Sequence, residues 1–554
     1  MATSLRGRPR LGGAKFHVIL FCVASAVFLY LSLSSCSIPS TSVPSPSISN
    51  HVTLNQAELE SLVIRTESHG PTSSERRLRV FMPADNPGIN LCKVVMSGLA
   101  LGYPLPILLN WDGDFNRPEW QFAGTHIAKL ESLLAVIEEL LDNDPDAHED
   151  DLALMIDAYD LWFQLPPSVL IQRFNQLNRE ANERNRQLWE QSASHQSFPI
   201  PPPEQSIIVT TAKDCFPLAD SGSDPHYELW PPSPMPTDFY GEGTDELTPP
   251  LWDSARKYRK IRPRCVNSGL IMGTMGAMRD SLRRCKEKVE QVAREGRQLW
   301  SDQALFGEVI GDQEAWRTWV RELASTWDGS IAESVNSTSD EHVRRIAEEA
   351  LGGVRFDFGI GLDYNFTTAP ATCSAEEDGY FVKLSDAAAI KELSEKAGVP
   401  NGVRVEEVPP ELSKSGLEED RFQNVNWEDQ SLYTDFFFGI APVGIHHNAY
   451  IDGLKAWRLK NWWDKMWFYP RLRELVTDTL QSSPDQPRPL ARVDDGDKQV
   501  LYQADKGVRV TNYSPGKGSL PARFDSMEWD EICQKGSRPW YNELFGDDKG
   551  PLRV

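Results

Sequence analysis

Two aspartates in the stretch "LALMIDAYDLWF", residues 152–163, have the type and spacing of a metal site. Asp157 and Asp160 follow an apolar run that is typical of a strand covered on both faces. Ligands of open α/β sheets bind at the carboxyl ends of such strands. Two carboxylates this close repel each other unless a positive charge neutralises them, and a divalent cation with oxygen ligands is the simplest such charge. The alternative is a strand-to-helix turn in which Asp160 caps the next element.

Two other acidic stretches offer the same side chains in a weaker context. Asp112 and Asp114 in "WDGDF" form a rival Asp-x-Asp site, but they follow an Asn-Trp pair and not a long apolar strand. The run "DDGD" at 494–497 lies in a polar stretch and reads as a solvated loop. We therefore rank the 157/160 pair first.

The elements that must position this pair alternate between strand and helix patterns. "KVVMSGLALG", residues 93–102, suits a first strand and its loop, and "SIIVTTA", residues 206–212, suits another buried strand. Between them, residues 125–144 carry Ile and Leu at helical spacing, and a charged helix extends to about residue 190. Strands alternating with helices predict an α/β fold with parallel pairing.

Less regular stretches interrupt this pattern. Residues 220–250 are rich in proline and suit a surface loop or a lid over substrate. Residues 325–345 and 400–430 read as polar or acidic insertions. We expect one catalytic domain over residues 75–475 and a loop-rich C-terminal extension over 476–554.

The N-terminus has the pattern of a membrane anchor. Arginines and a lysine within residues 1–15 precede an apolar run over 16–35 that is long enough to span a bilayer, so we expect a cytoplasmic tail and a signal anchor. A cleaved signal peptide is the alternative. Residues 36–74 then begin with a Ser/Pro-rich stretch typical of a stalk. Either interpretation puts the rest of the chain in the secretory lumen, as a single-pass type II protein of the Golgi or endoplasmic reticulum membrane.

Composition and cysteine content agree with that compartment. The formal net charge of -23 argues against a nucleic-acid partner, because phosphate backbones attract basic surfaces. Some of the cysteines beyond the stalk are expected to pair in an oxidising lumen, although six cysteines allow fifteen pairings. The sequons at Asn336, Asn365 and Asn512 are compatible with glycosylation there.

Several short segments occur in an order that resembles a known family. They are "GTHIAKL", "LMIDAYDLWF", "IVTTAKDCFP", "CVNSGLIMGT", "SDQALF" and "GIHHNAYIDGLKAW". Together they resemble the glycosyltransferase domain of the procollagen lysyl hydroxylases and related collagen glycosyltransferases and, more distantly, glycogenin-type transferases. The resemblance covers roughly residues 76–460, with no hydroxylase domain after it. It implies a GT-A-like, Rossmann-like mixed sheet flanked by helices, on an N-terminal transmembrane anchor.

The resemblance also implies a ligand set for the metal. Asp157 and Asp160 match the metal-binding aspartates of a D-x-x-D motif, for Mn²⁺ or Mg²⁺. Related transferases supply a third ligand from a late histidine, which His446 in "HHN" matches, with His447 as the alternative. Lys455 resembles a lysine that reaches donor phosphate, where its ammonium acts as a point charge. A solvated loop lysine is the plainer interpretation of Lys455.

Further positions are matched to the donor and to transfer. Tyr159 matches a position that stacks on the donor base, and Gly124 and Lys129 match a segment near the nucleotide, although Lys129 also suits the polar face of a helix. The segment Asn267, Ser268 and Gly269 matches a lining for donor or acceptor sugar, with a plain turn as the alternative. Asp302 and Gln303 match a pair near the transfer centre, where Asp302 is either catalytic or a helix cap.

Two positions near residue 214 bear on how far the match extends. Cys215 matches a family cysteine for which a disulfide is the expected role. Lys213 stands where the family has an acidic residue, which leaves room for a different donor or acceptor.

The sequence therefore predicts a metal-dependent glycosyltransferase that moves a sugar from a nucleotide sugar to a hydroxyl of a protein or glycan. A UDP-sugar is favoured over a GDP-sugar, and Asp302 and Lys455 are the predicted catalytic residues. A glycosidase, with two carboxylates flanking one sugar site, is one alternative. A noncatalytic luminal sugar-binding or scaffold protein is the other.

Overall fold

A twisted mixed sheet of ten strands forms the centre of the computed structural model. The structure describes residues 52–63, 74–120, 124–192, 198–247, 256–334, 340–405, 408–413, 417, 421–482, 485–495 and 498–553. Eight strands follow one path in the spatial order β16 (Arg523–Ser526), β15 (Thr511–Ser514), β3 (Ile107–Leu109), β2 (Glu75–Pro83), β4 (Leu152–Ile156), β7 (Cys265–Thr274), β6 (Ile207–Ala212) and β9 (Ile360–Asp363). The other two, β13 (Arg488–Asp495) and β14 (Lys498–Ala504), form a hairpin that joins β2.

The sheet mixes parallel and antiparallel pairs, and β4 itself has one parallel and one antiparallel neighbour. β2 pairs in parallel with β3 and β4, whereas β7 pairs antiparallel with both β4 and β6. The expected mixed α/β sheet is confirmed. The parallel pairing expected from alternating strands and helices holds for β2 with β3 and β4 and for β6 with β9, whereas β7 runs opposite to both of its neighbours.

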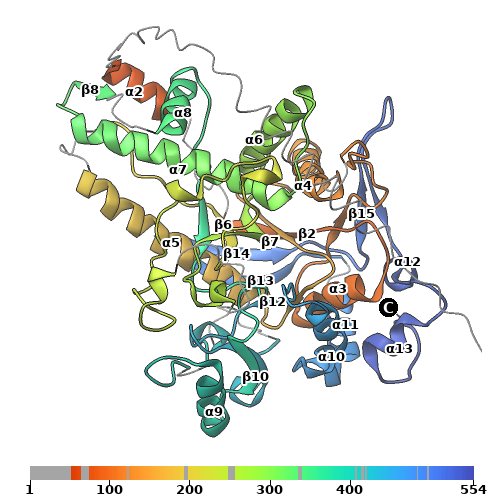
Figure 1. The fold of residues 1–554 in the computed structure, drawn as a ribbon. Coiled ribbons are helices and arrows are strands. Elements are labelled where there is room, and N and C mark those ends of the chain that lie inside the picture. Colours follow the sequence, from red (N-terminus) through yellow and green to blue (C-terminus); the bar gives the residue numbers. More distant parts are fainter. Residues whose placement is uncertain are drawn as a thin grey trace, which may run out of the picture. The chain divides into compact units, whose positions relative to one another are not determined.

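Helices cover both faces of the sheet, and the strands alternate their side chains between the two layers (Figure 1). In β2, Val80 packs into one layer and the adjacent Phe81 into the other; Leu154 and Met155 of β4 do the same. The first layer contains α3 (Ile89–Leu101), α5 (Pro167–Ser192) and α11 (Leu472–Gln481). The second contains α4 (Gly124–Asn143), α6 (Met275–Arg294) and α7 (Asp302–Thr326). Burial on both faces explains the continuous apolar run of β4.

The stretch expected to be the first strand is a helix. Residues 93–101 lie in α3, Gly102 is its C-cap, and residues 91–101 are all buried. A helix buried on every side carries no polar stripe, so its apolar run cannot be told from a buried strand by periodicity. The first strand of the large sheet is β2, which begins at Glu75.

The extension expected over residues 476–554 packs on the domain that precedes it. β14 pairs in parallel with β2, β15 pairs in parallel with β3, and a disulfide joins Cys92 of α3 to Cys533 of α12 (Trp529–Cys533). Residues 51–554 form one compact unit. The pairing of these short strands could not be predicted from the sequence, because polar loops separate them and their partners lie hundreds of residues away.

The stalk expected over residues 36–74 is folded in part. β1 (Val52–Asn55) pairs antiparallel with β8 (Ile331–Ser334), and α2 (Gln56–Val63) follows it. Leu54, Leu59 and Leu62 pack into a small apolar cluster with α7 and α8 (Glu341–Leu351). The insertion expected over 325–345 therefore provides part of the surface on which this segment packs.

The expected membrane anchor lies outside the described residues. Among the residues that the structure does describe, none of the helices combines the length and apolarity needed to cross a bilayer.

Smaller elements complete the unit. β10 (Gly379–Lys383) and β11 (Ser431–Asp435) form an antiparallel pair beside α9 (Ala387–Ala397). β5 (Leu161–Phe163) pairs with β12 (Gly444–His446). The helices α10 (Leu454–Asn461) and α13 (Trp540–Phe545) lie late in the chain.

A chain that ends at residue 482 is expected to lose cooperative folding. It would leave β2 and β3 unpaired along one edge and remove the buried side chains of Tyr502, Ile532 and Leu544. Each buried apolar side chain stabilises the fold by about 2 kcal/mol, a large share of a total of ~5–15 kcal/mol. Thermal unfolding followed by circular dichroism tests this, with deletion of residues 1–50 as the control. A truncated chain with the same cooperative transition as the control would restore the predicted boundary.

Candidate metal centre at the end of strand β4

The turn "DAYD" leaves the buried end of β4 and enters β5, so its two carboxylates lie at the end of the strand as expected. The backbone N–H of Asp157 donates to the carbonyl of Gly269 in β7 (2.9 Å). β12 pairs antiparallel with β5, with His446 opposite Leu161, and the N–H of His447 donates to the carbonyl of Asp160 (2.7 Å). The β5–β12 pairing therefore places a histidine beside both aspartates.

Asp157, Asp160 and His446 form one cluster. Each offers a ligand atom, and these atoms all lie within 4.8 Å of one another. Nε2 of His446 lies 3.3 Å from Oδ2 of Asp157 and 3.6 Å from Oδ2 of Asp160. The Asp157 side chain is 32 % exposed and that of Asp160 is 7 % exposed, so solvent reaches the cluster from the Asp157 side.

Two lysines neutralise the carboxylates. Nζ of Lys129, on α4, lies 2.7 Å from Oδ1 of Asp157 and 3.1 Å from Oδ2 of Asp302, and it also donates to the carbonyl of Ser268. Nζ of Lys455, on α10, lies 2.5 Å from Oδ2 of Asp160. Lys129 is buried, whereas the Lys455 side chain is half exposed. Lys455 is thus the cation that a ligand from solvent reaches.

These contacts shift the proton affinities in a consistent direction. Burial by itself would raise the pKa of Asp157, but Lys129 and His446 lower it well below its ordinary value. Asp160 is likewise buried, and His446 and Lys455 lower its pKa. Burial opposes protonation of His446, but the carboxylates of Asp160 and Asp157 outweigh it and raise its pKa to about 9. Without a metal, the imidazole therefore carries a proton at neutral pH.

The segment Asn267-Ser268-Gly269 of β7 orients this histidine. Oδ1 of Asn267 lies 3.1 Å from Nδ1 of His446 and also accepts the N–H of Gly269. Since Oδ1 can only accept, Nδ1 carries a proton and Nε2 faces the carboxylates. A Cβ at Gly269 would lie 2.3 Å from the His446 ring, so only glycine fits there. The predicted sugar lining thus contacts the candidate metal ligand directly.

His447, the alternative ligand, lies in the core. Its ring packs edge-on against Trp162 (4.2 Å between centroids), and neither ring nitrogen has a hydrogen-bond partner among the described residues. Burial lowers the pKa of His447 well below its ordinary value. His446, and not His447, faces the aspartates.

Asp302 and Gln303 begin α7 and connect it to the cluster. Oδ2 of Asp302 accepts from the Ser268 hydroxyl (2.9 Å) and from Lys129. Oε1 of Gln303 accepts from the Ser268 N–H and from Asn267, and its amide donates to the carbonyl of Phe216. Ser301, not Asp302, caps α7, because its hydroxyl accepts the N–H of Ala304. This geometry contradicts the capping interpretation of Asp302.

Tyr159 and Gly124 are placed by packing with neighbouring loops. The Tyr159 hydroxyl donates to Oδ1 of Asp85 (2.8 Å) and accepts the N–H groups of Asp85 and Asn86. These bonds fix the ring against the loop between β2 and α3. Gly124 begins α4, where an added Cβ would lie 2.3 Å from the Arg117 carbonyl.

A cavity of about 770 Å³ adjoins Lys455. Its lining includes Lys93, Lys455, Lys460, Asn90 and Glu543, which come from α3, α10 and α13. Lys93 was not predicted as a site residue, because residues 93–102 were expected to form a strand. Glu543 was not predicted either, because the C-terminal segment was expected to be an extension. Neither residue belongs to a recognisable motif.

The rival acidic pair, Asp112 and Asp114, and Lys213, which stands where the family has an acidic residue, are not part of the cluster of Asp157, Asp160 and His446. Asp114 pairs with Lys517 (2.5 Å), and the structure, over the residues that it describes, contains no metal-type cluster at Asp112 and Asp114. Lys213 is buried and paired with Asp378, so it balances a buried charge. Cys215 forms a disulfide with Cys265, as expected, and this bond joins the ends of β6 and β7.

The donor set fits a divalent cation. Two carboxylates and a neutral imidazole whose other nitrogen is already bonded to Asn267 are ligands that Mn²⁺ accepts, and carboxylates also suit Mg²⁺. Lys129 and Lys455 can also neutralise the charges of Asp157 and Asp160 by themselves. A metal would take over the role of Lys455 at Asp160 and would require His446 to lose its Nε2 proton.

Comparisons with known proteins add no family assignment. No protein-family model matches the chain, and a search of curated proteins finds no match.

In the presence of a chelator, stability is expected to fall as the pH rises from about 6.5 to about 9. The folded-state pKa of His446 lies above its ordinary 6.5, so the protonated imidazole stabilises the fold fully below that pH and loses this effect through about 9. The contribution is on the order of 3 kcal/mol. Urea unfolding across this pH window measures it, in the natural protein and in His446→Gln.

The His446→Gln variant should lack this pH dependence, and excess Mn²⁺ should suppress it in the natural protein, because a metal ligand is neutral imidazole. Identical pH dependence in the variant and the natural protein would refute the assignment of the shift to His446.

Proposed function

We propose that this protein is a metal-dependent glycosyltransferase that moves a sugar from a nucleotide sugar, with a UDP-sugar favoured, to a hydroxyl of a protein or glycan. Asp157, Asp160 and His446 would hold Mn²⁺ or Mg²⁺. The resemblance of its ordered segments to the glycosyltransferase domain of procollagen lysyl hydroxylases suggests the same class.

One observation carries the proposal. Residues from five of the ordered segments meet at the end of β4, and an accessible lysine joins them to a large cavity. Lys455 contacts Asp160 and lines that cavity, and Asp157 is open to solvent. A ligand with a diphosphate and a larger organic part suits this arrangement, because the diphosphate needs cations and the rest needs space.

When bound, the metal would neutralise negative charge on the departing nucleoside diphosphate. Lys455 would leave Asp160 and donate to a phosphate oxygen, which supplies a second positive charge. Lys129 is held by Asp157, Asp302 and the Ser268 carbonyl, so it keeps the aspartates fixed without reaching the ligand. The protein therefore contributes preorganised charges and orientation.

Asp302 has a separate role in this proposal. One of its oxygens, Oδ2, is engaged by Lys129 and Ser268. We assign its other oxygen to a sugar hydroxyl at the transfer centre, where a carboxylate orients the sugar or accepts the acceptor proton. Asn267 and Gly269 act through His446, because they hold its ring. Tyr159 is proposed to stack on the donor base from the DAYD turn, where its bonds to Asp85 and Asn86 fix its ring.

The two disulfides support a location in the secretory lumen. Cys92–Cys533 and Cys215–Cys265 both join segments far apart in the sequence, and such bonds persist in oxidising compartments. With the apolar run over residues 16–35, they support a type II protein of the Golgi or endoplasmic reticulum membrane with its catalytic unit in the lumen.

Changing both aspartates, Asp157→Asn with Asp160→Asn, is expected to lower metal-dependent release of nucleoside diphosphate at least about 100-fold. The fold should persist, because Lys129 keeps its bonds to Asp302 and to the Ser268 carbonyl. The assay measures diphosphate release from a panel of UDP- and GDP-sugars with and without Mn²⁺. The matched control is Asp112→Asn with Asp114→Asn, which should keep full activity. Full turnover in the first variant would eliminate the proposed metal centre.

Lys455→Met is expected to reduce kcat/KM at least about tenfold, because the half-exposed ammonium next to Asp160 is lost. Lys460→Met is the matched control, since Lys460 lines the same cavity on the same helix. Steady-state kinetics with the preferred donor compare the two variants. An equal, small effect in both would show that Lys455 acts only through the overall charge of the cavity.

A further inference from the structure

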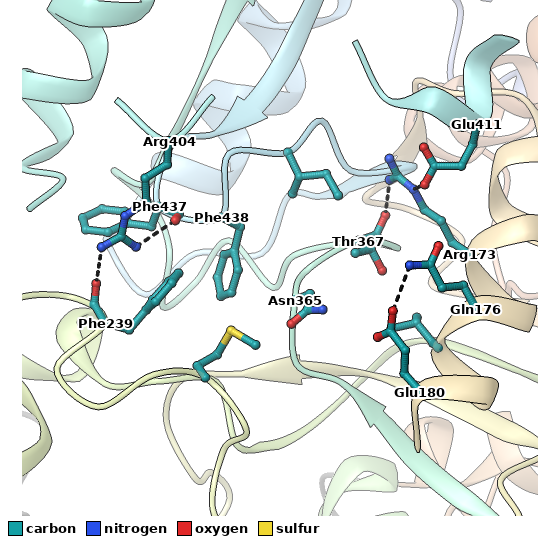
Figure 2. A pocket seen from close by; sticks show the side chains of 13 residues that line it. Arg173, Gln176, Glu180, Phe239, Asn365, Thr367, Arg404, Glu411, Phe437 and Phe438 are labelled. Atoms are coloured by element: carbon teal, nitrogen blue, oxygen red, sulfur yellow. Dashed lines mark hydrogen bonds and ion pairs between the residues drawn. The ribbon is translucent and has the colours of Figure 1, made fainter. Parts of the chain in front are cut away.

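Figure 2 shows a second cavity, of about 400 Å³. Its lining comes from α5, from the loop around residue 239, from residues 365–367, from Arg404 and Glu411, and from the segment that precedes β12. We propose that this cavity binds a neutral sugar residue. The proposal does not depend on the proposed transferase activity, because no residue of the metal centre lines this cavity.

One side of the cavity is aromatic. Phe239, Phe437 and Phe438 lie on this side, as Figure 2 shows. The rings of Phe239 and Phe438 lie 4.9 Å apart, and Arg404 covers Phe239 at 4.3 Å while donating to the carbonyls of Phe437 and Phe239. These bonds use Arg404 to hold the aromatic wall in place. The apolar C–H face of a pyranose packs against such a wall.

The opposite side is polar, and it is built from a buried arginine (Figure 2). Arg173, on α5, is only 2 % exposed. Its Nη1 donates to the carbonyls of Thr367 and Ala441, and its Nε donates to Oε1 of Glu411 (3.1 Å). The guanidinium is therefore fixed in orientation before any ligand arrives.

One buried acceptor in this lining, Oδ1 of Asn365, has no hydrogen-bond partner among the described residues. An unsatisfied buried acceptor costs free energy. A ligand hydroxyl that donates to this oxygen removes the cost.

The charge of the lining selects for a neutral ligand. Arg173 and Arg404 are balanced by Glu180 and Glu411, so the cavity favours neither a phosphate nor a cation. A purely apolar ligand would leave Oδ1 of Asn365 unsatisfied. A neutral polyhydroxylated ring with one apolar face satisfies both walls, and the cavity has the size of a small-molecule site.

The cavity reaches the surface and is linked to the metal centre through the backbone. Gln176 in its lining is exposed, so a ligand can enter from solvent. Ile440 lines the cavity, and the same chain segment ends at His446, where β12 pairs with β5. A glycan already bound here would be held by the segment that positions the candidate metal ligand.

The test is ligand-observed saturation-transfer NMR on the purified full-length protein, with chelator present and no nucleotide. The probes are methyl glycosides of glucose, galactose, mannose and N-acetylglucosamine, with phenol as the apolar probe. We expect saturation transfer to at least one glycoside. Phe438→Leu should weaken that binding about tenfold, because the leucine loses the aromatic face. Asn365→Ala is the second variant and removes an acceptor without touching the aromatic wall.

Asp157→Asn with Asp160→Asn is the matched control and should keep glycoside binding unchanged. Loss of binding in that control would place the sugar at the metal centre and overturn the proposal. Binding of phenol alone, or no binding of any probe, would also overturn it. Asn365 belongs to the sequon Asn-Phe-Thr, so mass spectrometry of its peptide is part of the test. A glycan attached to Asn365 would mean that the cavity holds the protein's own modification and would reject the free ligand.

Discussion

The electrostatic compensation of Asp157 and Asp160 is the constraint on which the candidate site depends. Two carboxylates lie at the end of a buried strand, where desolvation disfavours their charge. Lys129 and Lys455 offset that cost, and the raised pKa of His446 shows that the imidazole takes part as well. Each cation comes from a different part of the chain, so the fold has to bring α4, α10 and β12 to one strand end.

The backbone makes this convergence rigid. The β5–β12 pairing fixes His446 opposite the DAYD turn, and Asn267 and Gly269 of β7 fix the angle of its ring. β7 lies between β4 and β6 and runs antiparallel to both, which brings Asn267 and Gly269 to the end of the sheet at which β4 ends. If β7 ran parallel to β4, these two residues would lie at the other end of the sheet. The mixed character of the sheet is thus tied directly to the site.

The C-terminal segment belongs to the same construction. It closes one edge of the sheet with β14 and β15, it is bonded to α3 through Cys92–Cys533, and it contributes Glu543 to the cavity beside Lys455. The second cavity also shares a segment with the metal centre, because the segment that ends at His446 lines this cavity at Ile440. The candidate metal centre, the two cavities, the core and the sheet edge therefore share supporting residues.

The sequence by itself determined what is local. The apolar run of β4, the amphipathic α4, and the pairing of Asp157 with Asp160 were predictable because strand burial, helical periodicity and charge repulsion act over a few residues. Tertiary structure alone decided the rest. Periodicity cannot distinguish α3 from a strand when every face is buried, and no local signal chooses His446 over His447 or pairs β14 with β2. Those outcomes depend on which distant segments share the limited space around one sheet.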